Sequence, residues 1–87
     1  MIHLVFGKEF LESAKGLERK LQLRLRGKLN QLQKNPFSAS LHTKPLTGPL
    51  KGFYSFRLGK DYRVVFRFVS SNTIHLLKVG HRRDIYR

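Results

Sequence analysis

Apolar residues recur along this chain with two different periods, and the changes of period mark the predicted elements. Residues 2–6 follow a period of two, which predicts a short β-strand. Residues 8–15 predict a short helix. Residues 17–34 predict a longer helix, because leucines recur there every three or four positions on one face. This stripe consists of Leu17, Leu21, Leu25, Leu29 and Leu32.

The long helix is followed by a stretch without either period. We expect Asn35 to close the helix in a left-handed cap and Pro36 to prevent its continuation. Residues 36–52 are rich in proline, glycine and serine and predict a long loop. Loops of this length are often functional, although a simple crossover from helix to sheet explains the pattern equally well.

After Gly52 the period of two returns and predicts three strands, at residues 53–58, 62–69 and 73–80. We expect one face of the first two strands to pack beneath the helices. That face carries Tyr54, Phe56 and Leu58, with Tyr62, Val64, Phe66 and Phe68. The other face is expected to be open to solvent and to carry Ser55, Arg57, Arg63 and Arg67.

The order of elements predicts a single α+β domain spanning residues 1–87. It consists of an N-terminal strand, a helical hairpin and a three-stranded antiparallel meander that together form one sheet. A chain of 87 residues can bury one small hydrophobic core.

Charge adds a requirement for a polyanionic partner. The chain has 18 Lys and Arg against 5 Asp and Glu, a formal net charge of +13. A generic solubilising surface mixes both signs, so we favour nucleic acid or an acidic protein as partner over a membrane surface. The chain has no cysteine, no signal peptide pattern and no apolar run near the roughly 20 residues that span a bilayer. We therefore expect a cytoplasmic protein.

The residues able to do chemistry are arginine, lysine, tyrosine and histidine, and they are densest at residues 78–87. The histidines lack zinc-site spacing, and no phosphate-binding loop, carboxylate pair or serine triad is present, so we expect no metal and no cofactor. RNA can be cleaved without metal if the 2′-hydroxyl is deprotonated, the phosphorane is stabilised and the leaving 5′-oxygen is protonated. Arginine forks can stabilise that charge, and His81 or Tyr86 can move protons. From composition alone, the same residues could equally serve only to grip a polyanion.

Four short motifs occur in order: KPLTG at residues 44–48, GFYSFRL at 52–58, DYRVVF at 61–66 and VGHRRDIY at 79–86. Together they resemble the RelE/ParE superfamily of toxins from bacterial and archaeal toxin–antitoxin modules. The predicted order of elements resembles the core of that fold, so the resemblance covers nearly the whole chain.

The resemblance implies a function and a set of site residues. Members of the RelE branch enter the ribosomal A site and cleave mRNA there by 2′-hydroxyl attack, leaving a cyclic phosphate, without metal. Carried onto this sequence, the pattern implies that Arg57, Arg63 and Arg82 hold the scissile phosphate. Tyr86 matches the family tyrosine that positions the nucleophile or acts as base. His81, where RelE has a lysine, matches the C-terminal acid or base of related toxins.

One departure changes the expected distribution of roles. Some RelE toxins carry a lysine, a candidate base, where Ser55 stands, and serine cannot replace it. The resemblance therefore shifts proton transfer toward His81 or Tyr86. Further basic residues are expected to contact RNA or the ribosome: Lys44, Lys51, Arg67, Arg83 and Arg87.

The resemblance also implies a partner and two rival functions. The partner is a cognate antitoxin whose acidic or amphipathic segment wraps the toxin, in a hetero-oligomer. One rival is a ParE-like toxin, which shares the fold but inhibits DNA gyrase and is no nuclease. The other is a non-catalytic RNA-binding module. The presence of all of Arg57, Arg63, Arg82 and Tyr86 favours mRNA cleavage.

Overall fold

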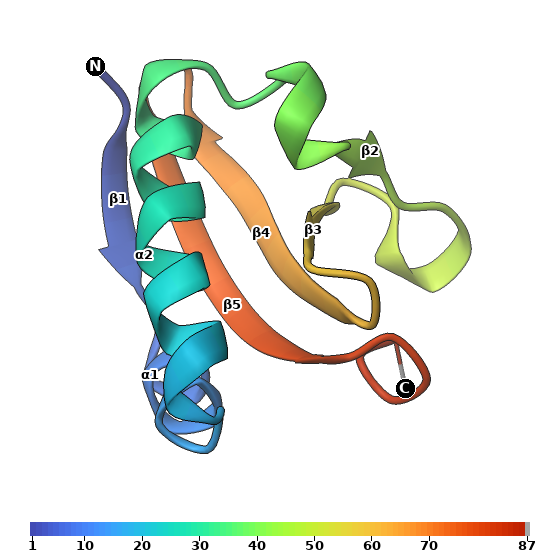
Figure 1. Ribbon diagram of the computed structural model, residues 1–87. Coiled ribbons are helices and arrows are strands. Elements are labelled where there is room, and N and C mark those ends of the chain that lie inside the picture. Colours follow the sequence, from blue (N-terminus) through green and yellow to red (C-terminus); the bar gives the residue numbers. More distant parts are fainter. Residues whose placement is uncertain (87) are drawn as a thin grey trace.

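A computed structural model describes residues 1–86 of the chain (Figure 1). It contains two helices, five strands and two short 3-10 turns. The helices are α1 (Lys8–Lys15) and α2 (Arg19–Lys34), and the 3-10 turns are η1 (Ala39–Leu41) and η2 (Gly48–Leu50). The strands are β1 (His3–Phe6), β2 (Lys44–Pro45), β3 (Tyr54–Leu58), β4 (Tyr62–Ser70) and β5 (Thr73–His81).

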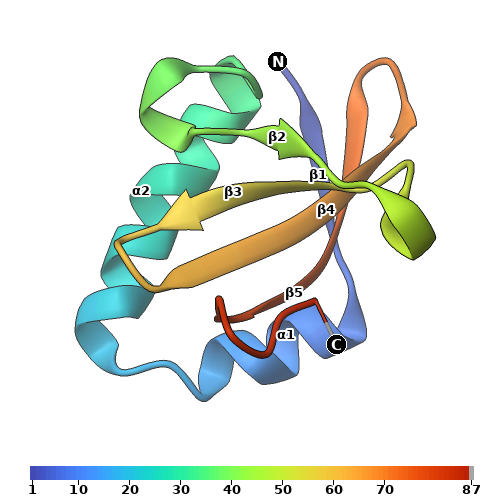
Figure 2. The ribbon, with the colours of Figure 1, turned by 90° about the vertical axis from the view of Figure 1, so that its right-hand side faces the viewer.

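The strands form one sheet in the order β1-β5-β4-β3-β2. β1 pairs with β5 in parallel, and the other neighbours are antiparallel. Both helices lie on one side of this sheet (Figure 1). Figure 2 shows the molecule after a 90° turn, with the segment that contains η2 and the C-terminal turn flanking the strands. The predicted α+β fold is confirmed, with β2 as an additional strand.

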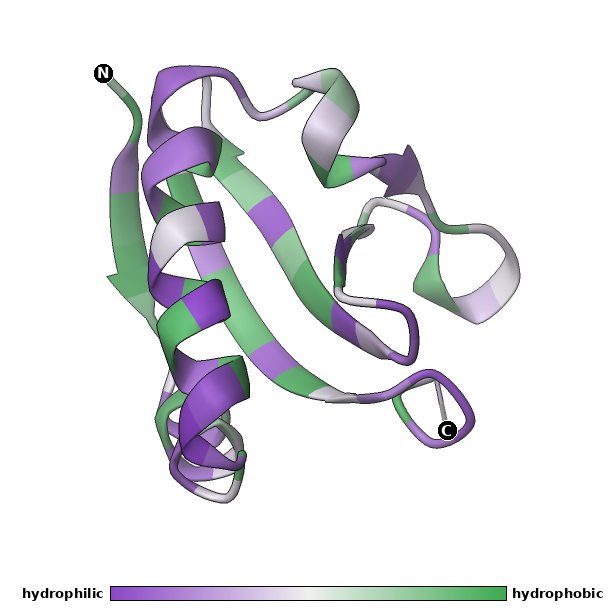
Figure 3. Ribbon diagram, viewed as in Figure 1, coloured by the Kyte–Doolittle hydropathy of each residue, from purple (hydrophilic) through white to green (hydrophobic). Residues whose placement is uncertain are grey.

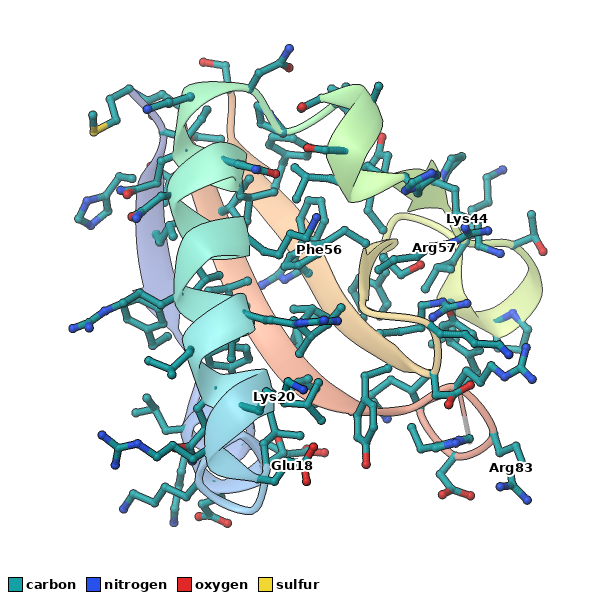
Figure 4. The ribbon with its side chains drawn as sticks, in the orientation of Figure 1. Glu18, Lys20, Lys44, Phe56, Arg57 and Arg83 are labelled. Atoms are coloured by element: carbon teal, nitrogen blue, oxygen red, sulfur yellow. The ribbon has the colours of Figure 1, made fainter. Side chains whose placement is uncertain are left out.

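The main core lies between the helices and the sheet, where the leucine stripe of α2 meets the aromatic face of β3 and β4. Phe56 points from β3 toward the helices (Figure 4), and the predicted faces of both strands are confirmed. Hydrophobic residues follow β1, β4 and β5, whereas the C-terminal turn is mostly hydrophilic (Figure 3). The buried members are Phe10, Leu25, Leu32, Leu41, Phe56, Leu58, Val64, Phe66, Ile74, Leu76 and Val79.

The long helix follows its prediction except at its ends. It begins at Arg19 and ends at Lys34. The predicted left-handed cap is wrong: Asn35 has an extended backbone (φ −158°, ψ 102°). Its side-chain Oδ1 instead accepts a hydrogen bond from the Phe37 N–H at 3.0 Å, which turns the chain away from the helix axis. No helix within residues 1–86 combines the length and the apolar character needed to cross a membrane.

The predicted loop of residues 36–52 contains a strand that the sequence did not reveal. In β2, Lys44 pairs with Ser55 and Pro45 with Tyr54. Two residues are too few to establish a period of two. Pro45 lies at the edge of the sheet, where a missing N–H is tolerated.

The second face of the sheet is less open than predicted. Leu46, Val65 and Ile85 form a separate buried cluster there, with Leu50, Phe53 and Leu77 packed against it. This cluster covers the middle of the face, and the Ser55 side chain is consequently only 1% exposed. Arg57 and Arg67 remain exposed, as expected.

A β-bulge places one further residue on this second face. Val65 pairs with Lys78 and Phe66 with Leu76, which leaves Leu77 as the extra residue on β5. Leu77 and Lys78 consequently both face away from the helices, since cross-strand partners share a face. Strict alternation from Ile74 would have turned Lys78 toward the core.

Candidate active site

The C-terminal turn folds back onto the second face of the sheet and is anchored there. The backbone N–H groups of Asp84 and Ile85 donate to the His81 carbonyl oxygen at 2.9 and 3.0 Å. This turn inserts the Ile85 side chain, which is 4% exposed, between Leu46 and Val65. The anchor brings the next residue, Tyr86, over the middle of β3.

Tyr86 and Ser55 form the central contact of the site. The Tyr86 hydroxyl donates to Ser55 Oγ at 3.0 Å, joining residues 31 positions apart. Ser55 is buried, whereas Tyr86 is 38% exposed. Ser55 therefore serves as a fixed acceptor that orients the tyrosine, and a lysine at this position would not reproduce that contact.

Tyr86 borders a groove of about 740 Å³, here called the Tyr86 groove. Lys44 and Lys78 also line it, and among residues 1–86 no carboxylate side chain does. Two ammonium groups beside a hydroxyl make this groove suited to a phosphate ester. The remaining lining residues come from the β2–η2 segment: Pro45, Leu46, Thr47, Pro49 and Leu50.

Lys78 is the site residue that sequence reasoning missed. Its signal is a single lysine between apolar residues of the last predicted strand. The bulge at Leu77 decides its direction, and a bulge cannot be located from alternation alone.

Arg57 and Arg63 lie beside this groove as a direct cross-strand pair of β3 and β4. Arg57 alternates with Phe56 along β3, and it also lines a cleft together with Arg24 and Lys28 of α2. Arg63 Nη1 donates to the carbonyl oxygens of Lys60 and Tyr62 at 3.1 and 2.9 Å, which holds it at the β3–β4 turn. Within residues 1–86, no hydrogen bond or ion pair holds the Arg57 guanidinium. Two arginines directly opposite repel each other, so the pair gains stability when an anion binds between them.

His81 has a defined environment at the end of β5. It pairs with Tyr62, whose ring lies 5.5 Å from the imidazole at an interplanar angle of 70°. Its Nδ1 accepts a hydrogen bond from the Arg83 N–H at 3.1 Å. In the neutral imidazole the proton is then on Nε2, so the ring presents a hydrogen-bond donor there.

Arg82 is tied to the β3–β4 turn through Asp61. The Arg82 N–H donates to the Asp61 carbonyl oxygen at 2.7 Å, and its Nε lies 3.7 Å from Asp61 Oδ1. The two side chains are 56% and 47% exposed, so this ion pair is weak. A phosphate can compete for the guanidinium while the backbone contact still holds the turn in place.

The structure thus places most predicted site residues near one end of the sheet, but on both of its faces. His81 shares the helix face with its partner Tyr62, whereas Arg57 and Arg63 lie on the second face. Arg57, Arg63, His81 and Arg82 lie around the β3–β4 turn and the end of β5, and Tyr86 occupies the adjoining groove. The roles predicted for these residues remain predictions.

The predicted RNA- or ribosome-binding residues are more dispersed. Lys44 lines the Tyr86 groove. Arg67 pairs with His75 farther along β4 and lies outside this group. Lys51 and Arg83 are exposed, after η2 and in the C-terminal turn respectively. Arg87 lies outside the described residues.

The chain was compared with protein families, curated proteins and solved structures. Residues 4–86 match the family model of the ParE toxin of type II toxin–antitoxin systems, parDE. Toxin RelK of Mycobacterium tuberculosis and Toxin YoeB of Mycobacterium bovis are each 34% identical over 64 residues, 74% of this chain and of each relative.

A solved structure extends the likeness to the fold. The toxin–antitoxin complex RelBE2 of Mycobacterium tuberculosis contains a chain that matches with a TM-score of 0.79 at 23% identity. The match covers 93% of this chain and 98% of that one. The match of the family model over nearly all residues, together with two curated relatives above 30% identity, shows that this chain belongs to the ParE toxin family of type II toxin–antitoxin systems, within the RelE/ParE superfamily.

Proposed function

We propose that this toxin is a ribosome-dependent endoribonuclease that cleaves mRNA in the A site and thereby inhibits translation. The observation that carries the proposal is the Tyr86 hydroxyl, fixed on Ser55 at 3.0 Å in a groove lined by Lys44 and Lys78. The relatives named RelK and YoeB support the RelE branch of the superfamily.

The proposed chemistry needs no metal or cofactor. The 2′-hydroxyl loses its proton as its oxygen bonds to the neighbouring phosphorus. The bond to the 5′-oxygen breaks, that oxygen gains a proton to become a 5′-hydroxyl, and a 2′,3′-cyclic phosphate remains. The Tyr86 oxygen positions the 2′-hydroxyl by accepting its hydrogen bond, because the tyrosine's own proton is directed to Ser55. His81 Nε2–H donates a hydrogen bond to the charge that develops on the leaving 5′-oxygen.

Charge stabilisation is assigned to the arginines. The pentavalent phosphorane carries one more negative charge than the substrate phosphate. Arg57, Arg63 and Arg82 supply fixed positive charge near that position, and preorganised charge of this kind usually contributes most to catalysis. Lys44 and Lys78 bind the adjoining phosphate.

The proposed partner in the resting state is a cognate antitoxin. The related RelBE2 toxin was solved as a toxin–antitoxin complex. For the present chain, a net charge of +13 favours an acidic or amphipathic segment that covers the Tyr86 groove in a hetero-oligomer. Ribosome and antitoxin would both place the protein in the cytoplasm.

Inhibition of DNA gyrase is the second candidate, because the matching family model is named for the parDE system. Purified toxin should be added to ribosomes programmed with a defined mRNA and, separately, to a gyrase supercoiling assay. We expect cuts within the A-site codon, ends with a 2′,3′-cyclic phosphate, and unaffected supercoiling. Blocked supercoiling with intact mRNA would reject the nuclease proposal.

Arg82→Ala tests the assignment of charge stabilisation. We expect mRNA cleavage on programmed ribosomes to fall at least tenfold, equivalent to about 1.4 kcal/mol of transition-state stabilisation. Arg19→Ala, on the exposed side of α2, is the control that removes one charge elsewhere and should retain cleavage. Equal activity of the two variants would remove Arg82 from the mechanism.

A further inference from the structure

A second concave surface lies between α2 and the β3–β4 turn and is strongly basic. This α2 cleft has a volume of about 430 Å³. Arg24 and Lys28 reach it from α2, His42 from the turn after η1, and Arg57 from β3. In the part of the chain that the structure describes, no carboxylate lines the cleft. Its cations therefore repel one another until an anion enters.

The three α2 side chains Arg24, Lys28 and Gln31 have defined contacts in the α2 cleft. Lys28 Nζ donates to the Ser40 carbonyl oxygen at 3.0 Å. Ser40 Oγ donates to Gln31 Oε1 at 2.6 Å, which leaves the Gln31 amide N–H groups, also in the cleft lining, as donors. Arg24 Nη1 lies 3.3 Å from the position that a Cβ on Gly59 would take, so the guanidinium packs closely over the turn. This arrangement presents donors at low entropic cost.

His42 reaches the α2 cleft from the residue that ends η1. It is the one non-glycine residue within residues 1–86 that has a positive φ, 51°. This residue is the C-cap of η1, and histidine is among the non-glycine residues most often found in the left-handed region.

Gly27 is an indication that the cleft is kept open for a ligand, because helix packing does not require a glycine there. It lies in the middle of α2, where glycine is among the least favourable residues. A Cβ at this position would meet no atom within 4 Å, so a larger side chain would fit. It lines the α2 cleft, and a larger residue would occupy the space open to a ligand.

We propose that the α2 cleft is a second phosphate-binding site, which holds backbone phosphates of RNA away from the scissile one. Arginine forks, an ammonium group and amide donors are the groups that bind phosphodiesters. Arg57 borders the cleft and also neighbours Ser55 on β3, so RNA can pass from the Tyr86 groove around the edge of β3. The inference rests on RNA being the substrate; the phosphates belong either to the message or to ribosomal RNA.

The first test compares two pairs of substitutions in the same helix. Arg24→Gln with Lys28→Gln removes two charges from the cleft. Arg19→Gln with Arg26→Gln removes two from a different surface of α2, beside Gln22 and Leu23. The ligand is a 2′-O-methyl RNA oligonucleotide, which keeps every phosphate but cannot undergo 2′-hydroxyl attack. We measure its dissociation constant by fluorescence anisotropy over a range of salt concentrations.

We expect the cleft pair to weaken binding at least tenfold more than the control pair. The slope of log affinity against log salt should fall by about 1.4, since each lost single-strand phosphate contact removes about 0.7. Both pairs should unfold at the wild-type temperature, because all four side chains are exposed or partly exposed.

Gly27 provides a second test that removes no contact. Gly27→Glu places a carboxylate in the cleft, and Gly27→Gln places an uncharged side chain of the same size there. Both replacements favour the helix, so neither should unfold the protein. We expect Gly27→Glu to bind the oligonucleotide at least fivefold more weakly than Gly27→Gln.

A parallel measurement of binding to purified ribosomes identifies the source of the phosphates. If the cleft substitutions weaken binding of the oligonucleotide more than the control substitutions do, the cleft binds the message. If they weaken binding of ribosomes alone, the cleft binds ribosomal RNA. Equal effects of cleft and control substitutions on both ligands would overturn the inference. So would weaker binding only to an acidic peptide, which would make the cleft an antitoxin surface. These results are distinct from a failure of the nuclease proposal. That proposal fails only if the wild-type protein leaves ribosome-bound mRNA uncut.

Discussion

The face of the sheet beneath the helices and the face that carries Tyr86 use the same strands but are packed differently. Beneath the helices, eleven buried hydrophobic residues form one cluster. On the second face the buried hydrophobic cluster has three members among residues 1–86, and Lys44 and Lys78 line the groove beside it. Burial of apolar area dominates folding stability, whereas convergent charges bind and stabilise anions. Substitutions on the two faces should therefore separate stability from activity.

The largest effect is expected from Phe56→Ala on the helix face. Phe56 is fully buried, and removing its ring leaves a cavity that should lower the free energy of unfolding by about 3–5 kcal/mol. This is a large part of the 5–15 kcal/mol typical of a folded domain. Urea denaturation measures it. A loss below about 1 kcal/mol would contradict the assignment of stability to this face.

Ile85→Ala is expected to lower the free energy of unfolding less than Phe56→Ala does, and to reduce mRNA cleavage as well. Ile85 anchors the C-terminal turn in the small cluster, and truncation there should cost about 2 kcal/mol, the low end for core truncations. Tyr86 then loses its fixed position over Ser55, and cleavage should fall at least tenfold. Leu23→Ala, at a residue that is 59% exposed, is the matched truncation and should change neither property. Full cleavage by the Ile85 variant would show that the anchor does not position Tyr86.

The smallest effect is expected from Ser55→Ala. It removes one hydrogen bond, worth about 0.5–1.5 kcal/mol, and water can replace that bond because Tyr86 is partly exposed. Cleavage should fall a few-fold, since the Tyr86 hydroxyl is retained but less well oriented. Thermal unfolding and cleavage rates measure the two effects. A loss of cleavage as large as that caused by removal of the Tyr86 hydroxyl itself would give Ser55 a direct role in the reaction.

Alternation and the leucine stripe were sufficient to predict most of the helix face. They correctly assigned the leucines of α2 and the inward faces of β3 and β4, because those residues obey one period over many positions. The predicted site residues around the β3–β4 turn came from a resemblance of short motifs, and the strand register brings them together.

The arrangement of the second face could not be predicted from the sequence, because it depends on features that leave no local pattern. A bulge directs Lys78 outward, β2 is only two residues long, and the Tyr86–Ser55 bond joins distant positions. The burial of Ser55 follows from these tertiary contacts. From the sequence, Ser55 is a position that lacks the lysine base of some RelE toxins. The structure shows it as the hydrogen-bond partner of Tyr86.

Removal of a single tyrosine hydroxyl on each face tests the central claim most directly. Tyr86→Phe removes the hydroxyl that binds Ser55. Tyr54→Phe removes one on the helix face, where the Tyr54 ring stacks on Phe66 and its hydroxyl makes no hydrogen bond within residues 1–86. On programmed ribosomes, Tyr86→Phe should cleave mRNA at least tenfold more slowly than the wild type. Tyr54→Phe should stay within about twofold and should unfold at the wild-type temperature. Tyr86→Phe loses the Ser55 hydrogen bond, worth about 0.5–1.5 kcal/mol, and should unfold only a few degrees lower. Wild-type cleavage by Tyr86→Phe, or equal loss in both variants, would contradict the account.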